Sequence, residues 1–151
     1  MGCRPRPDPV RALAFPVILV DTSAWVEFLR STGSPVHRYL HELINGDTAL
    51  ATTEVVVMEV LAGARDDDHL RRLRRLLLRC ELIPLKGLRD YEAAAALYRD
   101  CRRQGRTIRR LADCLIAVAA IGRGTSVLHA DGDFETLARY SPLRIARPPA
   151  S

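Results

Sequence analysis

The sequence predicts an α/β protein with a three-layer α/β/α architecture and a mostly parallel central sheet. Short runs of aliphatic and β-branched residues, such as VILV at residues 17–20, alternate with longer segments of helical period. Because a predicted helix separates most successive strands, the strands need crossover connections and should run parallel. The length of 151 residues, 48% of them hydrophobic, is enough for one well-buried domain and short for two.

The first part of the chain contains three predicted strands. The run at residues 17–20 ends at Asp21-Thr22-Ser23, residue types that favour a helix start. Apolar residues recur at intervals of three and four along residues 34–45, and Gly46 ends that helix. Pro84 excludes a long helix around residues 81–85. We therefore expect strands at residues 17–20, 48–51 and 81–85, and helices at residues 24–29, 34–45, 54–63 and 66–79.

The second part of the chain adds an alanine-rich helix at residues 88–104, stopped by Gly105, and an apolar helix at residues 109–121. After these we expect a strand at residues 125–129, a short helix at residues 133–139 and a last strand at residues 143–146. The expected domain is residues 17–147. Residues 1–16 are either a disordered leader or a mis-assigned start, and residues 148–151 are a tail.

Composition narrows the class of protein. No apolar run is long enough to cross a membrane, and the N-terminal segment lacks the apolar core of a secretion signal, so we expect a soluble cytoplasmic protein. The net charge is +5, and every cation except Lys86 is an arginine. Arginine suits phosphate recognition, which makes a polyanionic partner plausible, although an arginine-biased genome gives the same composition.

Acidic side chains directly follow two of the predicted strands. Asp21 comes after the buried run at residues 17–20, and Asp131 and Asp133 follow the strand at residues 125–129. In parallel sheets this carboxyl edge is where ligands bind. The structural alternative for Asp21 and for Asp133 is an ordinary helix N-cap, and for Asp133 alone we favour it.

Two further acids lie on predominantly apolar helices. Glu59 has Val55, Val56, Ala62 and Gly63 three and four positions away, so its helical face is not a solvated one. Asp113 lies near the start of the helix at residues 109–121. The alternatives for Glu59 are a helix edge that touches solvent or a buried arginine partner. The alternative for Asp113 is a favourable position at the helix dipole beside an arginine.

Together these four segments can place their carboxylates in one crevice. Two carboxylates about 5 Å apart repel by roughly 3 kcal/mol at an effective dielectric near 20, so a cluster needs a bound cation. Oxygen ligands without a coherent histidine or cysteine set favour Mg²⁺ or Mn²⁺. Such ions act on phosphates, so an acidic metal pocket on a basic protein predicts metal-dependent cleavage of a nucleic acid.

The same segments resemble the PIN domain, and most closely the VapC-type toxins of bacterial toxin–antitoxin pairs. The resemblance lies in VILVDTSAW from residue 17, EVLAGAR from residue 59, DCLIA from residue 113 and DGDF from residue 131, and extends over residues 17–147. It implies a small Mg²⁺-dependent endoribonuclease that a VapB-type antitoxin holds inactive, commonly as a homodimer. By motif, the acidic quartet would be Asp21, Glu59, Asp113 and Asp131, with Asp133 as an accessory acid and Ser23 or Thr22 as a polar helper.

The chain departs from the family pattern at Arg110, where a serine or threonine often stands. As a hypothesis, Asp21, Asp113 and Asp131 hold Mg²⁺ directly or through waters, and Glu59 orients or deprotonates the attacking water. Trp25 and Tyr140 are available to stack on bases, although core packing is the favoured role of Trp25. The arginines expected to contact the RNA backbone are Arg102, Arg103, Arg106, Arg109 and Arg110.

Three other interpretations are weaker. His37 and His41 have the i, i+4 spacing of a zinc pair, but no third ligand is evident. A phosphotransfer domain with Asp21 as nucleophile lacks the second aspartate of its motif, since Ser23 stands there, and Lys86 has no clear role. The main alternative to the nuclease is a catalytically inactive RNA- or protein-binding module on the same fold, which the complete set of acids argues against.

Overall fold

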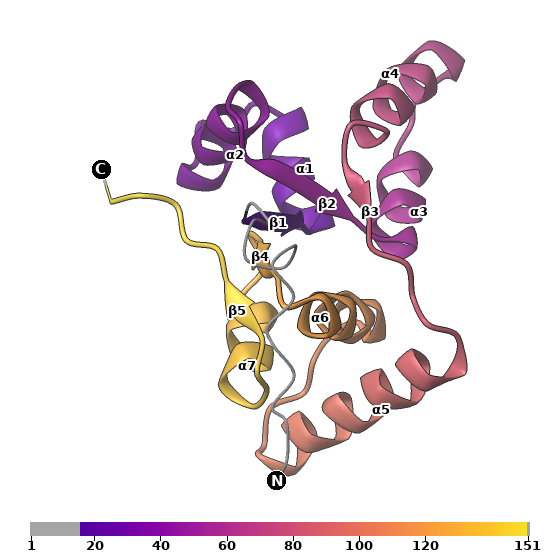
Figure 1. The fold of residues 1–151 in the computed structure, drawn as a ribbon, viewed down its shortest axis with the longest axis vertical. Helices are drawn as coiled ribbons and strands as arrows, with labels where there is room; N and C mark the ends of the chain where they lie inside the picture. The colour runs from indigo at the N-terminus through magenta and orange to yellow at the C-terminus, as the bar shows by residue number, and fades with distance from the viewer. Residues whose placement is uncertain (1–15, 151) are drawn as a thin grey trace, which may run out of the picture.

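A computed structural model describes residues 16–150, in which strands and helices alternate (Figure 1). The strands are β1 (Val17–Val20), β2 (Ala49–Thr52), β3 (Glu81–Leu82), β4 (Ser126–Leu128) and β5 (Arg144–Ile145). The helices are α1 (Thr22–Leu29), α2 (Pro35–Asn45), α3 (Glu54–Ala62), α4 (Asp67–Leu77), α5 (Leu88–Arg103), α6 (Leu111–Arg123) and α7 (Asp133–Arg139).

The strands form one sheet in the order β3-β2-β1-β4-β5, and every strand pairing in it is parallel. Strand β1 is central: Ile18 is in register with Leu50 of β2 on one side and with Ser126 of β4 on the other. From β1 the chain builds the sheet first toward β3 and later, in the opposite direction, toward β5. The carboxyl ends of β1 and β4 therefore lie at the point where the strand order reverses, where open α/β sheets form a crevice.

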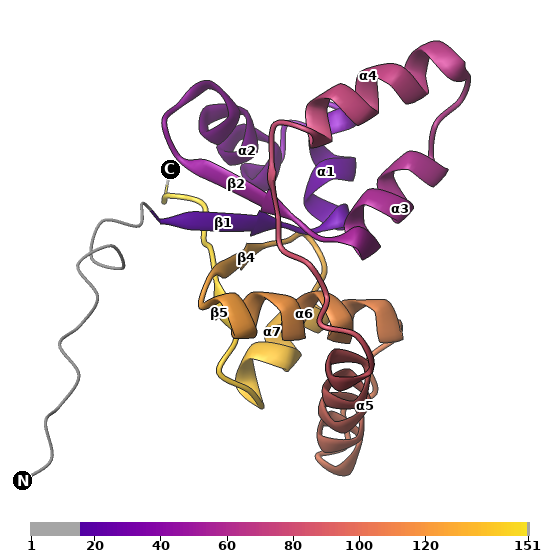
Figure 2. The ribbon, with the colours of Figure 1, turned by 45° about the vertical axis from the view of Figure 1, so that its right-hand side comes forward.

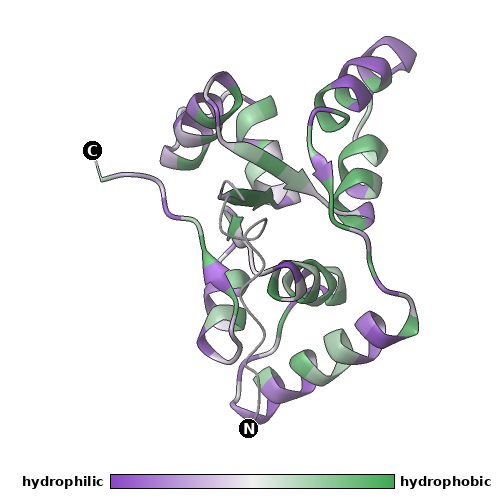
Figure 3. Ribbon diagram, in the orientation of Figure 1, coloured by the Kyte–Doolittle hydropathy of each residue, from purple (hydrophilic) through white to green (hydrophobic). Residues whose placement is uncertain are grey.

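Helices surround this sheet. Helices α1 to α4 gather around the half formed by β1, β2 and β3, and helices α5 to α7 gather around β4 and β5 (Figures 1 and 2). The central strands β1 and β2 and helix α6 are largely apolar, whereas the edge strands β3 and β5 are partly hydrophilic and α4 is strongly hydrophilic along most of its length (Figure 3). Trp25, Leu19, Phe134 and Ile108, from four separate segments, are among the largest fully buried side chains of the core.

The predicted fold class is confirmed, as a five-stranded parallel sheet flanked by helices. All the expected elements are present with small shifts at their ends. The largest shift is at residues 81–85, where the strand has only two residues because Pro84, which has no N–H, follows closely. Within residues 16–150, no helix combines the length and apolarity needed to cross a membrane. The expected leader falls on residues outside the described range, apart from Pro16.

Candidate metal-dependent active site

Asp21 stands at the carboxyl end of the central strand and begins α1. Its backbone N–H donates to the Leu128 carbonyl of β4 at 2.9 Å, which joins the ends of the two strands. One carboxylate oxygen, Oδ2, accepts from the N–H of Ser23 at 2.9 Å and from its hydroxyl at 2.5 Å. Asp21 is therefore the helix N-cap, as the structural alternative predicts. Its side chain is nevertheless completely buried, and burial raises the pKa of the carboxyl.

Asp113 projects from the first turn of α6 toward the same edge of the sheet. The residue is fully buried, although Leu111, the first residue of the same helix, is exposed. Burial is the main cause that raises the pKa of Asp113 to about 7, and the negative charge of Asp21 is the second. A carboxyl group with this pKa is ready to bind either a proton or a cation near neutral pH.

Asp131 and Asp133 lie just beyond β4, with side chains 13% and 18% exposed. The N–H of Asp133 donates to Oδ1 of Asp131 at 3.0 Å. Gly132, not Asp133, is the N-cap residue of α7, so the favoured prediction that Asp133 caps this helix is wrong. Its carboxylate instead turns toward Arg109, whose backbone N–H and side-chain Nε donate to Oδ2 at 3.0 and 3.2 Å.

Glu59 approaches the acids from α3. Its carboxylate is 19% exposed, and Oε1 accepts a hydrogen bond from the Thr22 hydroxyl at 3.0 Å. Its other oxygen, Oε2, accepts from Arg110 Nη1 at 3.2 Å. The apolar neighbours of Glu59 on α3, Val55 and Val56, are buried. The helix thus holds Glu59 at the rim of the cluster with both oxygens engaged.

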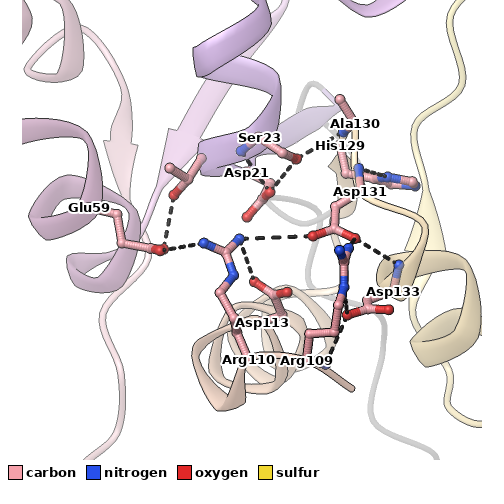
Figure 4. Close-up of polar contacts among 11 residues, drawn as sticks. Asp21, Ser23, Glu59, Arg109, Arg110, Asp113, His129, Ala130, Asp131 and Asp133 are labelled. Atoms are coloured by element: carbon pink, nitrogen blue, oxygen red, sulfur yellow. Dashed lines mark hydrogen bonds and ion pairs between the residues drawn. The ribbon is translucent and has the colours of Figure 1, made fainter. Parts of the chain in front are cut away.

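Two arginines enter the acidic cluster from the residues that precede α6 (Figure 4). Arg109 Nη2 donates to Asp131 at 2.6 Å, and its Nε pairs with Asp133. Arg110 Nη2 lies 3.4 Å from Asp113 Oδ1 and 3.9 Å from Asp131 Oδ2. Arg110 is therefore the partner arginine that the structural alternatives for Glu59 and Asp113 require. Both arginine side chains, expected at the RNA backbone, are here paired with carboxylates, and their contact with RNA stays a prediction.

The other three arginines expected to contact RNA lie outside the acidic cluster, two on α5 and one in the turn that follows it. Arg103 forms an ion pair with Asp100 one turn earlier on α5. The guanidinium carbon of Arg102 lies over the Tyr98 ring, 5.8 Å from its centre. Arg106 is exposed in the turn after α5. Their exposure is compatible with RNA contact, which stays a prediction.

The cluster retains oxygens that the arginines leave unsatisfied. Oδ1 of Asp21 and Oδ2 of Asp113 are buried and have no hydrogen-bond partner among residues 16–150. Asp113, Asp131 and Asp133 each place one carboxylate oxygen within 4.8 Å of the others. Because buried carboxylate oxygens without a partner are costly, and because the donors are all oxygen, the set fits a hard cation. The acidic cluster of this domain therefore indicates a metal-ion site.

The geometry differs in one respect from the ligand set expected from the motifs. That set was Asp21, Asp113 and Asp131, whereas the closest group of oxygens contains Asp133 in place of Asp21. Sequence reasoning also missed what Ser23 does. Its hydroxyl donates to Asp21 and accepts from the Ala130 N–H at 2.9 Å, which ties the two strand ends together (Figure 4). The motifs indicated Ser23 or Thr22 only as a polar helper, without this bridge between the strand ends.

Side chains considered for other roles lie elsewhere. Trp25 is fully buried, which confirms its favoured role in the core, and Tyr140 is half-buried. His37 and His41 both lie beside the Phe28 ring, and Nδ1 of His37 accepts from the Gly33 N–H at 2.9 Å. In the part of the chain that the structure describes, neither histidine belongs to a group of potential metal ligands.

Comparison with known proteins agrees with this fold. The PIN-domain profile matches residues 18–140 of the chain. Ribonuclease VapC11 of Mycobacterium tuberculosis and VapC ribonuclease Mb1587 of Mycobacterium bovis are each 41% identical over 131 residues, 86% of this chain and 98% of the relative.

Solved structures with the same fold have lower sequence identity. The VapBC2 complex of Rickettsia felis, bound to a promoter DNA fragment, matches with a TM-score of 0.68 and 18% identity, over 86% of this chain and 97% of that one. VapC20 of Mycobacterium tuberculosis, a toxin that cleaves the sarcin–ricin loop, matches with a TM-score of 0.63 and 19% identity, over 84% and 98%. Profile, relatives and fold agree: the chain belongs to the PIN-domain family, among the VapC ribonuclease toxins of VapBC toxin–antitoxin systems.

Proposed function

We propose that the protein is a Mg²⁺-dependent endoribonuclease that cleaves RNA phosphodiester bonds at the acidic cluster. The observation that carries this proposal is the unsatisfied oxygen of the buried Asp113, which lies beside Asp131 and Asp133 at the carboxyl edge of the sheet. Asp113 and Asp131 would hold the metal, with Asp21 or Asp133 completing the ligands directly or through water. Mn²⁺ is a second ion that suits the same oxygen ligands.

The proposed chemistry divides roles among the acids. When bound, Mg²⁺ would neutralise negative charge on the scissile phosphate and favour the ionisation of a nearby water. Glu59, at the rim, orients that water and accepts its proton through Oε2, the oxygen that faces Arg110. Thr22 fixes the other oxygen of Glu59 by donating its hydroxyl hydrogen, so only one oxygen turns toward the cluster. Ser23 holds Asp21 in place.

The proposed partners follow from the family. Two of its structural neighbours are VapBC proteins bound to DNA, from Rickettsia felis and Salmonella typhimurium. We propose that a VapB-type antitoxin binds this toxin and holds it inactive, and that the toxin forms a homodimer. The RNA substrate would approach the metal site along its exposed rim, where Glu59 and Arg110 lie.

The test is cleavage of purified cellular RNA by the wild-type protein with Mg²⁺, with EDTA, and by the Asp21→Asn and Asp113→Asn variants. Asp47→Asn, on an exposed residue between α2 and β2, is the matched control. The proposal predicts cleavage by the wild type and the control with Mg²⁺, and none with EDTA or either site variant. Identical RNA patterns from all four proteins would overturn it in favour of a binding module on this fold.

A further inference from the structure

The arginines nearest the metal site are already engaged by carboxylates. Arg109 pairs with Asp131 and Asp133, and Arg110 spans Glu59 and Asp113. Their positive charge therefore offsets acids of the site before any RNA phosphate arrives. A nuclease built around a cluster of carboxylates repels a polyanion locally, so it needs cations elsewhere to retain the substrate.

Helix α4 carries such cations. Residues 71–79 include five arginines and no acid. Arg72, Arg75 and Arg79 follow one another at intervals of three and four, which places them along one side of the helix. The turn after α4 continues this geometry, since the Leu78 N–H donates to the Arg74 carbonyl at 2.9 Å and the Arg79 N–H donates to that of Leu76 at 3.3 Å. With a rise of 1.5 Å per residue, this arginine row is about 10 Å long.

The arginine row faces away from the core. Leu73 and Leu77, which anchor α4, are 3% and 4% exposed, whereas all three arginines of the row are exposed. Within residues 16–150, none of the three forms an ion pair; Arg71, beside them, pairs with Asp68. The row is thus a set of solvated guanidinium groups without a direct ion pair in the described residues, although the charge of Arg72 acts on Asp66 at the start of the helix.

Helix α4 follows α3, the helix that carries Glu59, and runs back toward the amino edge of the sheet, where Arg79 lies beside Thr48 and Ala49. The hairpin of α3 and α4 lies on one side of the site, and α5 with the start of α6 lies on the other side (Figure 2). The hairpin that reaches into the site with Glu59 therefore also carries the arginine row. The exposed Arg102 and Arg106 lie near the end of α5, on the opposite side.

We propose that Arg72, Arg75 and Arg79 form a binding surface for the phosphate backbone of the RNA substrate. This inference rests on the proposed ribonuclease function and adds a contact surface outside the acidic cluster. The composition favours RNA over a protein partner, because five cations without an acid among residues 71–79 match a polyanion, whereas the core of a protein interface is depleted in charge. Phosphate contacts of this kind hold the strand without reading its sequence.

The test measures RNA binding separately from cleavage. A labelled single-stranded RNA of mixed sequence is titrated with full-length protein in EDTA, across a series of salt concentrations, and the dissociation constant is read by fluorescence anisotropy. The test variant combines Arg72→Ala, Arg75→Ala and Arg79→Ala. The matched control combines Arg38→Ala, Arg89→Ala and Arg139→Ala, which removes the same charge from exposed positions on α2, α5 and α7.

The proposal predicts that the α4 variant binds RNA at least about tenfold more weakly at low salt, and that its plot of log affinity against log salt is shallower by about 2, or roughly 0.7 for each lost phosphate contact. The control should bind as the wild type does. Equal losses in both variants would show a general charge effect and overturn the surface, as would unchanged binding by the α4 variant. Unchanged RNA binding with loss of binding to a VapB-type antitoxin would assign α4 to the protein partner instead.

Two features keep the outcome interpretable. Alanine at exposed helical positions favours helix formation, so the α4 variant should remain folded, which its thermal melting curve checks. The assay contains no divalent metal, so it does not depend on catalysis. If the wild type binds RNA through α4 but never cleaves it, the proposed catalytic function fails and the binding surface stands.

Discussion

Arg110 places its Nη2 3.4 Å from Oδ1 of Asp113, whose second oxygen is buried without a partner in residues 16–150. The arginine thus engages one of the two oxygens of a fully buried carboxylate. Arg110 is itself 47% exposed, so its long side chain reaches inward from the surface and is free to move outward. A cation bound by Asp113 and Asp131 would share their negative charge with Arg110, so the two cations compete.

We therefore expect Arg110→Gln to bind Mg²⁺ more tightly than the wild type, by about tenfold, because a positive charge a few ångströms from the ligands is removed. Without metal, the same variant should melt at a lower temperature, since Glu59, Asp113 and Asp131 then repel one another unopposed. Isothermal titration with Mg²⁺ and thermal melting in EDTA measure the two effects. Arg38→Gln, on α2, is the control, and unchanged or weaker Mg²⁺ binding by Arg110→Gln would refute the competition.

Asp113 should make the metal-free protein less stable as the pH rises. Its pKa is about 7 in the folded protein, above the ordinary value of 3.8, so between these values the folded state holds a proton that the unfolded state has released. The free energy of unfolding therefore falls as the pH rises through this window and levels off above pH 7. Asp113→Asn abolishes this contribution, so the variant should be more stable than the wild type at pH 8 by at least about 1 kcal/mol.

The measurement is urea unfolding in EDTA at pH 5 and pH 8. The stability difference between Asp113→Asn and the wild type should be larger at pH 8 than at pH 5. An equal difference at both values would mean that Asp113 does not titrate in this range.

Ser23 should contribute both to the stability of the fold and to the alignment of the acids. Its hydroxyl bridges Asp21 and the Ala130 N–H, so Ser23→Ala removes two hydrogen bonds and leaves Asp21 with fewer donors. We expect a loss of about 1–2 kcal/mol in the free energy of unfolding and a fall in the RNA cleavage rate. Urea unfolding and cleavage assays measure these changes. Ser126→Ala is the control because, in the described range, its hydroxyl makes no hydrogen bond; an equal effect there would remove the special role of Ser23.

The fold could be predicted from the sequence because local patterns determine it. The run VILV at residues 17–20 has no polar residue, so it had to lie in the centre of a sheet, and β1 does. Glycine ends several of the helices, such as α2 at Gly46, α3 at Gly63 and α6 at Gly124. The N-cap of α7 was predicted wrongly because Asp133 has the right residue type, but Arg109 attracts its carboxylate from a distant segment.

The site is predictable only in part, for a related reason. Asp21 and Glu59 stand out in the sequence because each interrupts an apolar pattern. The arginine partners are evident only in part. Arg110 lies three residues before Asp113, as the alternative for Asp113 expects. Its pairing with Glu59, and that of Arg109 with Asp131, arise only when distant segments pack together. Long-range ion pairs of this kind depend on tertiary structure, so residue spacing does not reveal them.

The most direct test of the account is a calorimetric titration of Mg²⁺ into the wild type, Asp113→Asn and Glu59→Gln. The proposed metal site predicts saturable Mg²⁺ binding to the wild type, loss of binding in Asp113→Asn, and retained binding in Glu59→Gln. The reason is that, in the proposed mechanism, Asp113 is a metal ligand whereas Glu59 acts on the attacking water. Equal Mg²⁺ binding by the wild type and Asp113→Asn would contradict the assignment of the acidic cluster as the metal site.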